Sequence, residues 1–228
     1  MRGANNRGFG FWTLTFLVVA NMVGAGVFTT SGFTLVSLGD PWLVMLAWLV
    51  AGAIALCGAF SYGLLVKQMP VSGGEYAFLS SSGFPFVGFV AGWVSLLAGF
   101  SGAIAYAALA FEEYLPGDLP HKLPAVIVVV LGALTHGGKR AVGALTQNIA
   151  VGLKLTLLAV ILYYGTWCMA SLEWQNTAPR SPADGSIILN FAQALIWISL
   201  SYSGFNAAVY IAGESKSSHV VAKSLIAG

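Results

Sequence analysis

The chain has 228 residues, of which 57% are hydrophobic and only 8% are charged, and its formal net charge is +2. Soluble domains usually carry about 25% charged residues, so this composition excludes an ordinary soluble protein. The small net charge also argues against a protein that binds nucleic acid through a basic surface. Apolar stretches long enough to cross a ~30 Å hydrocarbon core recur along the whole chain, which predicts an all-α polytopic membrane protein in contact with the lipid bilayer.

Six membrane spans are predicted, at residues 9–38, 42–66, 84–110, 119–135, 144–170 and 187–213. The segments between them are "LGDPW", "KQMPVSGGE", "EEYLPGDLPHK", "HGGKR" and "EWQNTAPRSPADGS", which carry the glycines, prolines and charges typical of turns. Glu75, in the second of these segments, is interpreted as a loop or helix-cap residue. We treat residues 1–228 as a single transmembrane domain.

The basic residues predict that the N-terminus lies in the cytoplasm. By its class, the protein is expected in a plasma membrane or a bacterial inner membrane. In this orientation the cytoplasmic side carries Arg2, Arg7, Lys67, Lys139, Arg140, Lys216 and Lys223, and the outer side carries Lys122 and Arg180. Such an excess of Lys and Arg inside is typical of membrane proteins. It also favours a crossing by the short fourth span, because Lys139 and Arg140 would otherwise lie outside. A cleaved signal peptide is the alternative for the N-terminus, and it is disfavoured because apolar sequence continues through Leu38.

Small and polar residues interrupt the centres of the first and sixth spans. "VGAGVFTTSG" (23–32) lies midway along a run that would be about 45 Å long as one helix, and "SLSYSGFN" (199–206) lies midway along the sixth span. Irregular backbone at this depth is tolerated where it lines a cavity or is buried in protein. Its free N–H groups can hold a carboxylate and its free C=O groups an ammonium. These are the two charges of an amino acid. Alternatively, the small residues allow close packing of straight helices.

Motifs for enzymatic or metal chemistry are absent from the sequence. "GAGVFT" has Thr29 where a dinucleotide-binding loop needs its third glycine, and no short strand precedes it. The histidines His121, His136 and His219 are too scattered for a zinc site, and Cys57 and Cys168 lie inside apolar runs, where they indicate neither a disulfide nor a metal. We therefore expect neither an enzyme nor a bound cofactor.

Lys154 is the one charged residue deep within a predicted span, about 15 Å along the helix from Ala144. A lysine near the centre of a bilayer is costly and marks a functional position by default. A lowered pKa would allow Lys154 to take up and release a proton. The alternative is a structural ion pair, or hydrogen bonds to free backbone carbonyls without proton coupling.

Five motifs in order resemble the amino acid permeases of the amino acid–polyamine–organocation superfamily. "NMVGAGVF" (21–28) resembles the signature of the first helix, and "MPVSGGEYAFL" (69–79) resembles the loop after the second. "GFVAGW" (88–93), "TQNIAVGLKL" (146–155) and "YSGFNAAVYIAGE" (202–214) are similar to segments of the third, fifth and sixth helices. The resemblance covers essentially the whole chain.

This resemblance implies a LeuT-type fold of two inverted five-helix repeats, of which the chain would supply the first repeat and the sixth helix. It implies a substrate carboxylate bound by the backbone around Gly24, Ala25 and Gly26. The amino group would be bound by carbonyls near Met22, Val23, Leu200, Ser201 and Ser203. Asn206 matches a substrate-contact position, and Lys154 occupies the place of a sodium ion in sodium-coupled relatives. Tyr202 is also a candidate for substrate binding. As an alternative, Tyr202, Ser203 and Asn206 serve equally well as polar contacts between helices.

Leu200 departs from the family pattern, because many members have an aromatic gate there. The predicted function is secondary active transport of amino acids by alternating access, through sodium-independent proton symport or exchange. A polyamine or other organocation transporter of the same fold, and a non-transporting half-protein or scaffold subunit, remain as alternatives. The chain ends at "AKSLIAG", where a seventh span would begin. We therefore expect it to be the N-terminal part of a longer permease with a missing C-terminal half.

Overall fold

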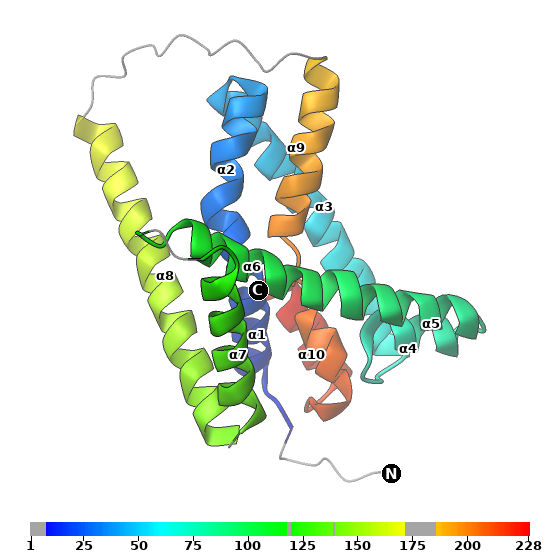
Figure 1. Cartoon of the computed structure of the whole chain (residues 1–228). Coiled ribbons are helices and arrows are strands. Elements are labelled where there is room, and N and C mark those ends of the chain that lie inside the picture. Colours follow the sequence, from blue (N-terminus) through cyan, green and yellow to red (C-terminus); the bar gives the residue numbers. More distant parts are fainter. Residues whose placement is uncertain (1–7, 118–119, 139, 172–185) are drawn as a thin grey trace. The chain divides into compact units, whose positions relative to one another are not determined.

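The structure is a computed structural model that describes residues 8–117, 120–138, 140–171 and 186–228 (Figure 1). Arg2, Arg7, Lys139 and Arg180, which contribute to the predicted orientation, lie outside these residues. Regular structure in the described ranges is helical. The described residues divide into two compact units, one within residues 1–95 and 179–228 and the other within residues 96–178.

Within the described residues, four helices are long and apolar enough to cross a membrane, namely Phe11–Leu38, Pro41–Gln68, Pro85–Glu113 and Leu145–Cys168. They coincide with the first, second, third and fifth predicted spans. The fourth and sixth predicted spans contain shorter apolar helices, Leu123–Gly137 and Ile187–Ser201. The prediction of an all-α polytopic membrane protein is therefore confirmed, while the division into six spans stays a prediction.

The interruption predicted in the first span is present. Helix α1 (Phe11–Met22) ends before Val23, and α2 (Ala25–Leu38) begins after Gly24, whose backbone is extended at φ −118° and ψ −168°. Helix α3 (Pro41–Gln68) follows, and the side chain of Asp40 caps it by accepting a hydrogen bond of 2.8 Å from the Trp42 N–H.

The sixth predicted span is also interrupted. Helix α9 (Ile187–Ser201) is regular, and residues 202–206 then form turns. A 3₁₀ segment (Ala207–Glu214) and helix α10 (Ser218–Ala227) complete the chain. Only the first half of the predicted span is thus an α-helix, because the backbone leaves the helical path at the "SYSGFN" stretch.

Helix α3 supports both interrupted segments of the first unit. Towards its start it packs against α2 and α9, where Val44 is buried with Leu38 and Ala194. Towards its end it packs against α10 and the 3₁₀ segment, where Val66 is buried in a cluster with Val221. Within a bilayer such contacts stabilise helix pairs mainly through van der Waals packing. The two interruptions therefore lie level with the middle of α3.

Two shorter helices complete the first unit. Helix α4 (Gly74–Ser81) follows α3 after a short loop, and it packs against α5 (Pro85–Val94). The side chain of Phe78, on α4, is buried in the same apolar cluster as Val66. This packing holds the beginning of α4 beside the C-terminal part of α3.

The second unit contains α6 (Gly102–Glu113), α7 (Leu123–Gly137) and α8 (Arg140–Ser171), preceded by a π-helical segment at Ser95–Ser101. Helix α7 packs against both α6 and α8. Large apolar side chains on these helices are widely exposed, as on α8 at Leu153, 71%, and Leu162, 61%. Apolar exposure on this scale is expected of surfaces that face lipid or further helices.

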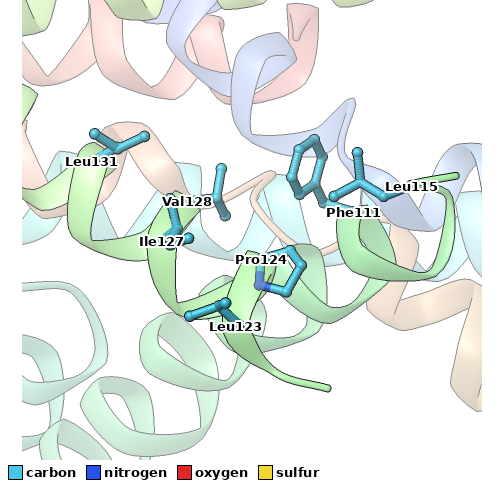
Figure 2. Close-up of a pocket in the computed structure, with 7 residues that line it drawn as sticks. All are labelled: Phe111, Leu115, Leu123, Pro124, Ile127, Val128 and Leu131. Carbon is cyan, nitrogen blue, oxygen red and sulfur yellow. The ribbon is translucent and has the colours of Figure 1, made fainter. Parts of the chain in front are cut away.

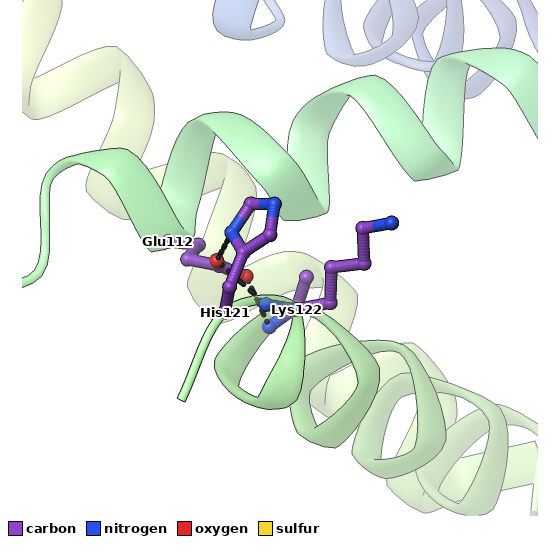
Figure 3. A network of polar contacts seen from close by, with 4 residues as sticks. Glu112, His121 and Lys122 are labelled. Atoms are coloured by element: carbon purple, nitrogen blue, oxygen red, sulfur yellow. Dashed lines mark hydrogen bonds and ion pairs between the residues drawn. The ribbon is translucent and has the colours of Figure 1, made fainter. Parts of the chain in front are cut away.

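A carboxylate caps the start of α7 from the end of α6 (Figure 3). Oε1 of Glu112 accepts a hydrogen bond of 2.8 Å from the Lys122 N–H and lies 2.9 Å from Nδ1 of His121, while Oε2 accepts from the Ala125 N–H at 3.4 Å. The first N–H groups of a helix have no partner within it, and they carry a partial positive charge. Glu112 therefore ties the α6–α7 connection to the helix that follows.

Candidate functional site

The two interrupted segments lie side by side in the first unit, with α2 packed along α9 (Figure 1). They approach each other closely at Gly26, where an added Cβ would lie 2.5 Å from Oγ of Ser201. One turn further along α2, the hydroxyls of Thr30 and Ser201 are hydrogen-bonded at 2.8 Å, and both residues are buried. Glycine at position 26 therefore allows the two helices to approach this closely.

A second contact joins the ends of α1 and α9. Gly204 has φ +110°, and a Cβ there would lie 2.9 Å from the backbone of Asn21. Side chains are rarely found at such a φ. The irregular segments thus touch each other on both sides of the first interruption, whereas a Cβ at Gly24 would meet no heavy atom within 4 Å. The backbone between α1 and α2 therefore borders open space.

This backbone presents both kinds of polar group. The N–H groups of Ala25 and Gly26 begin α2, where a helix has no internal partners for them and its dipole is positive. The last turn of α1 presents carbonyls at the negative end of its dipole. The Met22 carbonyl accepts a hydrogen bond of 2.9 Å from the Gly24 N–H. The Val23 N–H donates to the Val19 carbonyl at 2.9 Å. A carbonyl oxygen has two lone pairs, so Met22 retains capacity to accept a second donor.

The predicted residues at the end of α9 have different surroundings. Leu200 is 60% exposed and Ser203 is exposed, whereas Ser201 is buried against α2. The Tyr202 hydroxyl donates to the Trp48 carbonyl at 3.3 Å, and the two rings pack edge to face at 5.4 Å between centroids. The side chains of Ser201 and Tyr202 therefore join helices, and only the backbone groups of these two residues are left to bind a ligand.

Asn206 belongs to a polar cluster centred on Glu75. Oε1 of Glu75 accepts hydrogen bonds from the Tyr62 hydroxyl at 2.6 Å and from Nδ2 of Asn206 at 2.7 Å. Oε2 accepts from the Tyr210 hydroxyl at 2.5 Å. Glu75 lies in the first turn of α4, but its carboxylate joins three distant side chains. Glu75 thus lies at the start of a helix, as the interpretation as a loop or cap residue expects, but that interpretation misses these three side-chain partners.

Glu75 is charged near neutral pH. Burial disfavours its ionised form, but the hydrogen bonds from Tyr210, Tyr62 and Asn206 outweigh this effect and hold the pKa of the carboxyl below its usual value. The carboxylate is therefore a fixed acceptor beside the interrupted end of α9.

Lys154 lies on α8, in the second unit, and its side chain is half-buried. It stands near the middle of the candidate span Leu145–Cys168. Its predicted role in coupling stays a prediction.

An apolar depression of about 270 Å³ lies between α6 and α7 in the second unit (Figure 2). It is lined by Phe111, Leu115, Leu123, Pro124, Ile127, Val128 and Leu131. None of these side chains can bind a charged group, so the depression does not match the two charges of an amino acid. The paired interruptions of the first unit are the better candidate.

Long apolar helices, two of them interrupted near their centres, define a polytopic helical membrane protein. Residues 9–228 match the amino acid permease family, and the chain belongs to this family. Its members are transporters, so the expectation that the chain is not an enzyme is confirmed.

The relatives that the chain resembles include amino acid transporters from animals and bacteria. It is 27% identical over 214 residues to a large neutral amino acids transporter small subunit 2 of Oryctolagus cuniculus, covering 87% of this chain and 39% of the relative. It is 26% identical over 205 residues to the serine/threonine exchanger SteT of Bacillus subtilis, covering 88% and 46%. For the b(0,+)-type amino acid transporter 1 of Rattus norvegicus, the identity is 27% over 211 residues, covering 87% and 42%. The chain thus spans less than half the length of these relatives.

Proposed function

We propose that the complete protein containing this chain transports amino acids across the membrane by alternating access. Segments 22–26 and 200–206 would hold the charged head group of the substrate. The observation that carries this proposal is the contact between the two interruptions, at Gly26 with Ser201 and at Asn21 with Gly204, beside open space at Gly24. The start of α2 offers N–H groups to a carboxylate, and the ends of α1 and α9 offer carbonyls to an ammonium.

The proposal includes a LeuT-type arrangement in which this chain forms the first five-helix repeat and the sixth helix. Alternating access then requires a second repeat, which the C-terminal half of the protein would supply. The N-terminus lies in the cytoplasm, as the distribution of Lys and Arg in the sequence favours. The protein resides in the plasma membrane or in a bacterial inner membrane.

Transport is independent of sodium and proceeds by exchange or by proton symport. Two features support this part of the proposal. One relative is named an exchanger. A lysine lies in the middle of the fifth predicted span, where its ammonium group would take the place of a bound cation. Lys154 is accordingly proposed as the coupling residue.

Uptake into proteoliposomes tests the proposal. The full-length permease is reconstituted, and entry of labelled leucine and serine is measured with and without unlabelled amino acid inside, in sodium or choline buffer. Saturable uptake that is unchanged by choline and is accelerated by internal substrate agrees with exchange. Uptake of neither probe above protein-free vesicles refutes transport of these amino acids, and efficient uptake of labelled putrescine in their place would identify an organocation transporter.

A further inference from the structure

We propose that Glu75 is a positioning residue that orients the side-chain amide of Asn206, so that the amide oxygen is presented to the ammonium group of the substrate. The inference rests on the proposed function, because it assigns a role within the same site. It concerns how the end of α9 distinguishes α-amino acids from molecules that lack the ammonium group.

The chemistry of the two side chains selects one orientation of the amide. An ionised carboxylate only accepts hydrogen bonds, whereas an asparagine amide has a donor, Nδ2, and an acceptor, Oδ1. Oε1 of Glu75 lies 2.7 Å from Nδ2 of Asn206. The flipped amide would place Oδ1 against Oε1, so that two acceptors faced each other without a proton between them. Glu75 therefore keeps the donor on its own side and leaves Oδ1 for a partner that donates.

Glu75 is itself held from two further elements. Tyr62 on α3 donates to Oε1, and Tyr210 in the 3₁₀ segment donates to Oε2. The carboxylate therefore cannot rotate without losing hydrogen bonds on both oxygens. A charge-assisted hydrogen bond to Nδ2 is also stronger than a neutral one and polarises the amide, which makes Oδ1 a better acceptor.

Asn206 is close in sequence to the contact between the two interruptions. Asn206 is two residues after Gly204, and Gly204 touches the backbone of Asn21 at the end of α1. The carbonyl groups at the end of α1 and the amide of Asn206 are uncharged acceptors of the kind that an ammonium, with three donors, requires. These acceptors therefore suit a substrate with a free ammonium group.

Three variants of the full-length permease test the pairing by labelled leucine uptake. E75Q removes the charge and replaces one acceptor oxygen with a donor, so that position 75 no longer selects one orientation of the Asn206 amide. N206D places two carboxylates about 3 Å apart, where like charges oppose each other. The double variant E75Q/N206D restores a donor at position 75 and an acceptor at position 206. S72A is the matched control. The Ser72 hydroxyl, just before α4, accepts a hydrogen bond of 2.9 Å from the Gly213 N–H in the 3₁₀ segment and does not contact Asn206.

We expect E75Q to raise the KM for leucine at least fivefold with little change in kcat, and N206D to raise it at least tenfold. The double variant should recover most of the loss caused by N206D, and S72A should keep the wild-type KM. An unchanged KM in E75Q, or a double variant no better than N206D, would overturn the proposal.

Thermal unfolding of the wild type, E75Q, N206D and the double variant in detergent separates this proposal from the proposed function. N206D should lower the Tm, and E75Q in the same chain should restore most of it. If the wild-type protein transports neither leucine nor serine, the proposed function fails. The thermal data then decide the pairing alone, and strictly additive shifts in Tm would overturn it.

Discussion

Replacement of Gly204 by alanine tests the contact between the two interruptions. The residue has φ +110°, which costs a non-glycine residue roughly 1–3 kcal/mol. The new Cβ would lie 2.9 Å from the backbone of Asn21, which cannot move aside as a flexible side chain can. Overpacking of this kind costs about 1–3 kcal/mol. The two effects together predict a destabilisation of about 2–6 kcal/mol and loss of the amino acid site.

The assay is thermal unfolding of the full-length permease in detergent, combined with leucine uptake by reconstituted protein. G132A is the matched control, because Gly132 is in the interior of α7 and a Cβ there meets no atom within 4 Å. We expect G204A to lower the Tm by several degrees and to abolish uptake. G132A should leave the Tm unchanged or raise it, since alanine favours a helix over glycine by about 1 kcal/mol. Equal Tm values for G204A and G132A would refute the reasoning.

Three further predictions concern single side chains. S201A removes the buried hydrogen bond to Thr30 and should destabilise the protein by about 1 kcal/mol, whereas S203A, at an exposed site, should be neutral by thermal unfolding. The lowered pKa of Glu75 means that its ionised form stabilises the fold above the unfolded pKa of about 4.3, and that this stabilisation is lost as pH falls through the folded pKa. The Tm difference between wild type and E75Q should thus be constant from about pH 7 to 5 and shrink below about pH 4; a difference that grows on acidification would contradict this. K154A should abolish uptake while the protein remains monodisperse in size-exclusion chromatography, and unchanged coupled uptake would exclude a coupling role for Lys154.

The positions of the interruptions could be predicted from the sequence because their cause is local. Glycines and small polar residues near the centre of a span remove the side chains that would keep a helix regular and well packed. Gly24 and Gly204 both lie where the α-helices stop. The length of the apolar runs predicts the long helices for the same reason, since a bilayer core of about 30 Å sets their minimum length.

The side-chain partners at the site could not be predicted, because they join residues far apart in the chain. Glu75 is 131 positions from Asn206 and 135 from Tyr210. No periodicity or motif indicates that these groups meet. The tertiary packing of α4 and the 3₁₀ segment on α3 brings them together. For the same reason the sequence does not indicate that the Ser201 side chain joins helices, whereas a contact between helices is one of the two alternatives that it offers for Tyr202.

Substrate protection of a cysteine at position 24 tests the central claim most directly. A cysteine fits there because a Cβ meets no neighbour within 4 Å, and the native thiols are removed by C57A and C168A. The rate of alkylation of G24C by N-ethylmaleimide is measured in the full-length permease with and without leucine or serine, and G132C on α7 is the control. The proposed site predicts severalfold slower alkylation of G24C in the presence of substrate and no change at G132C. Equal rates at G24C in a protein that transports the same amino acid would show that the substrate binds elsewhere.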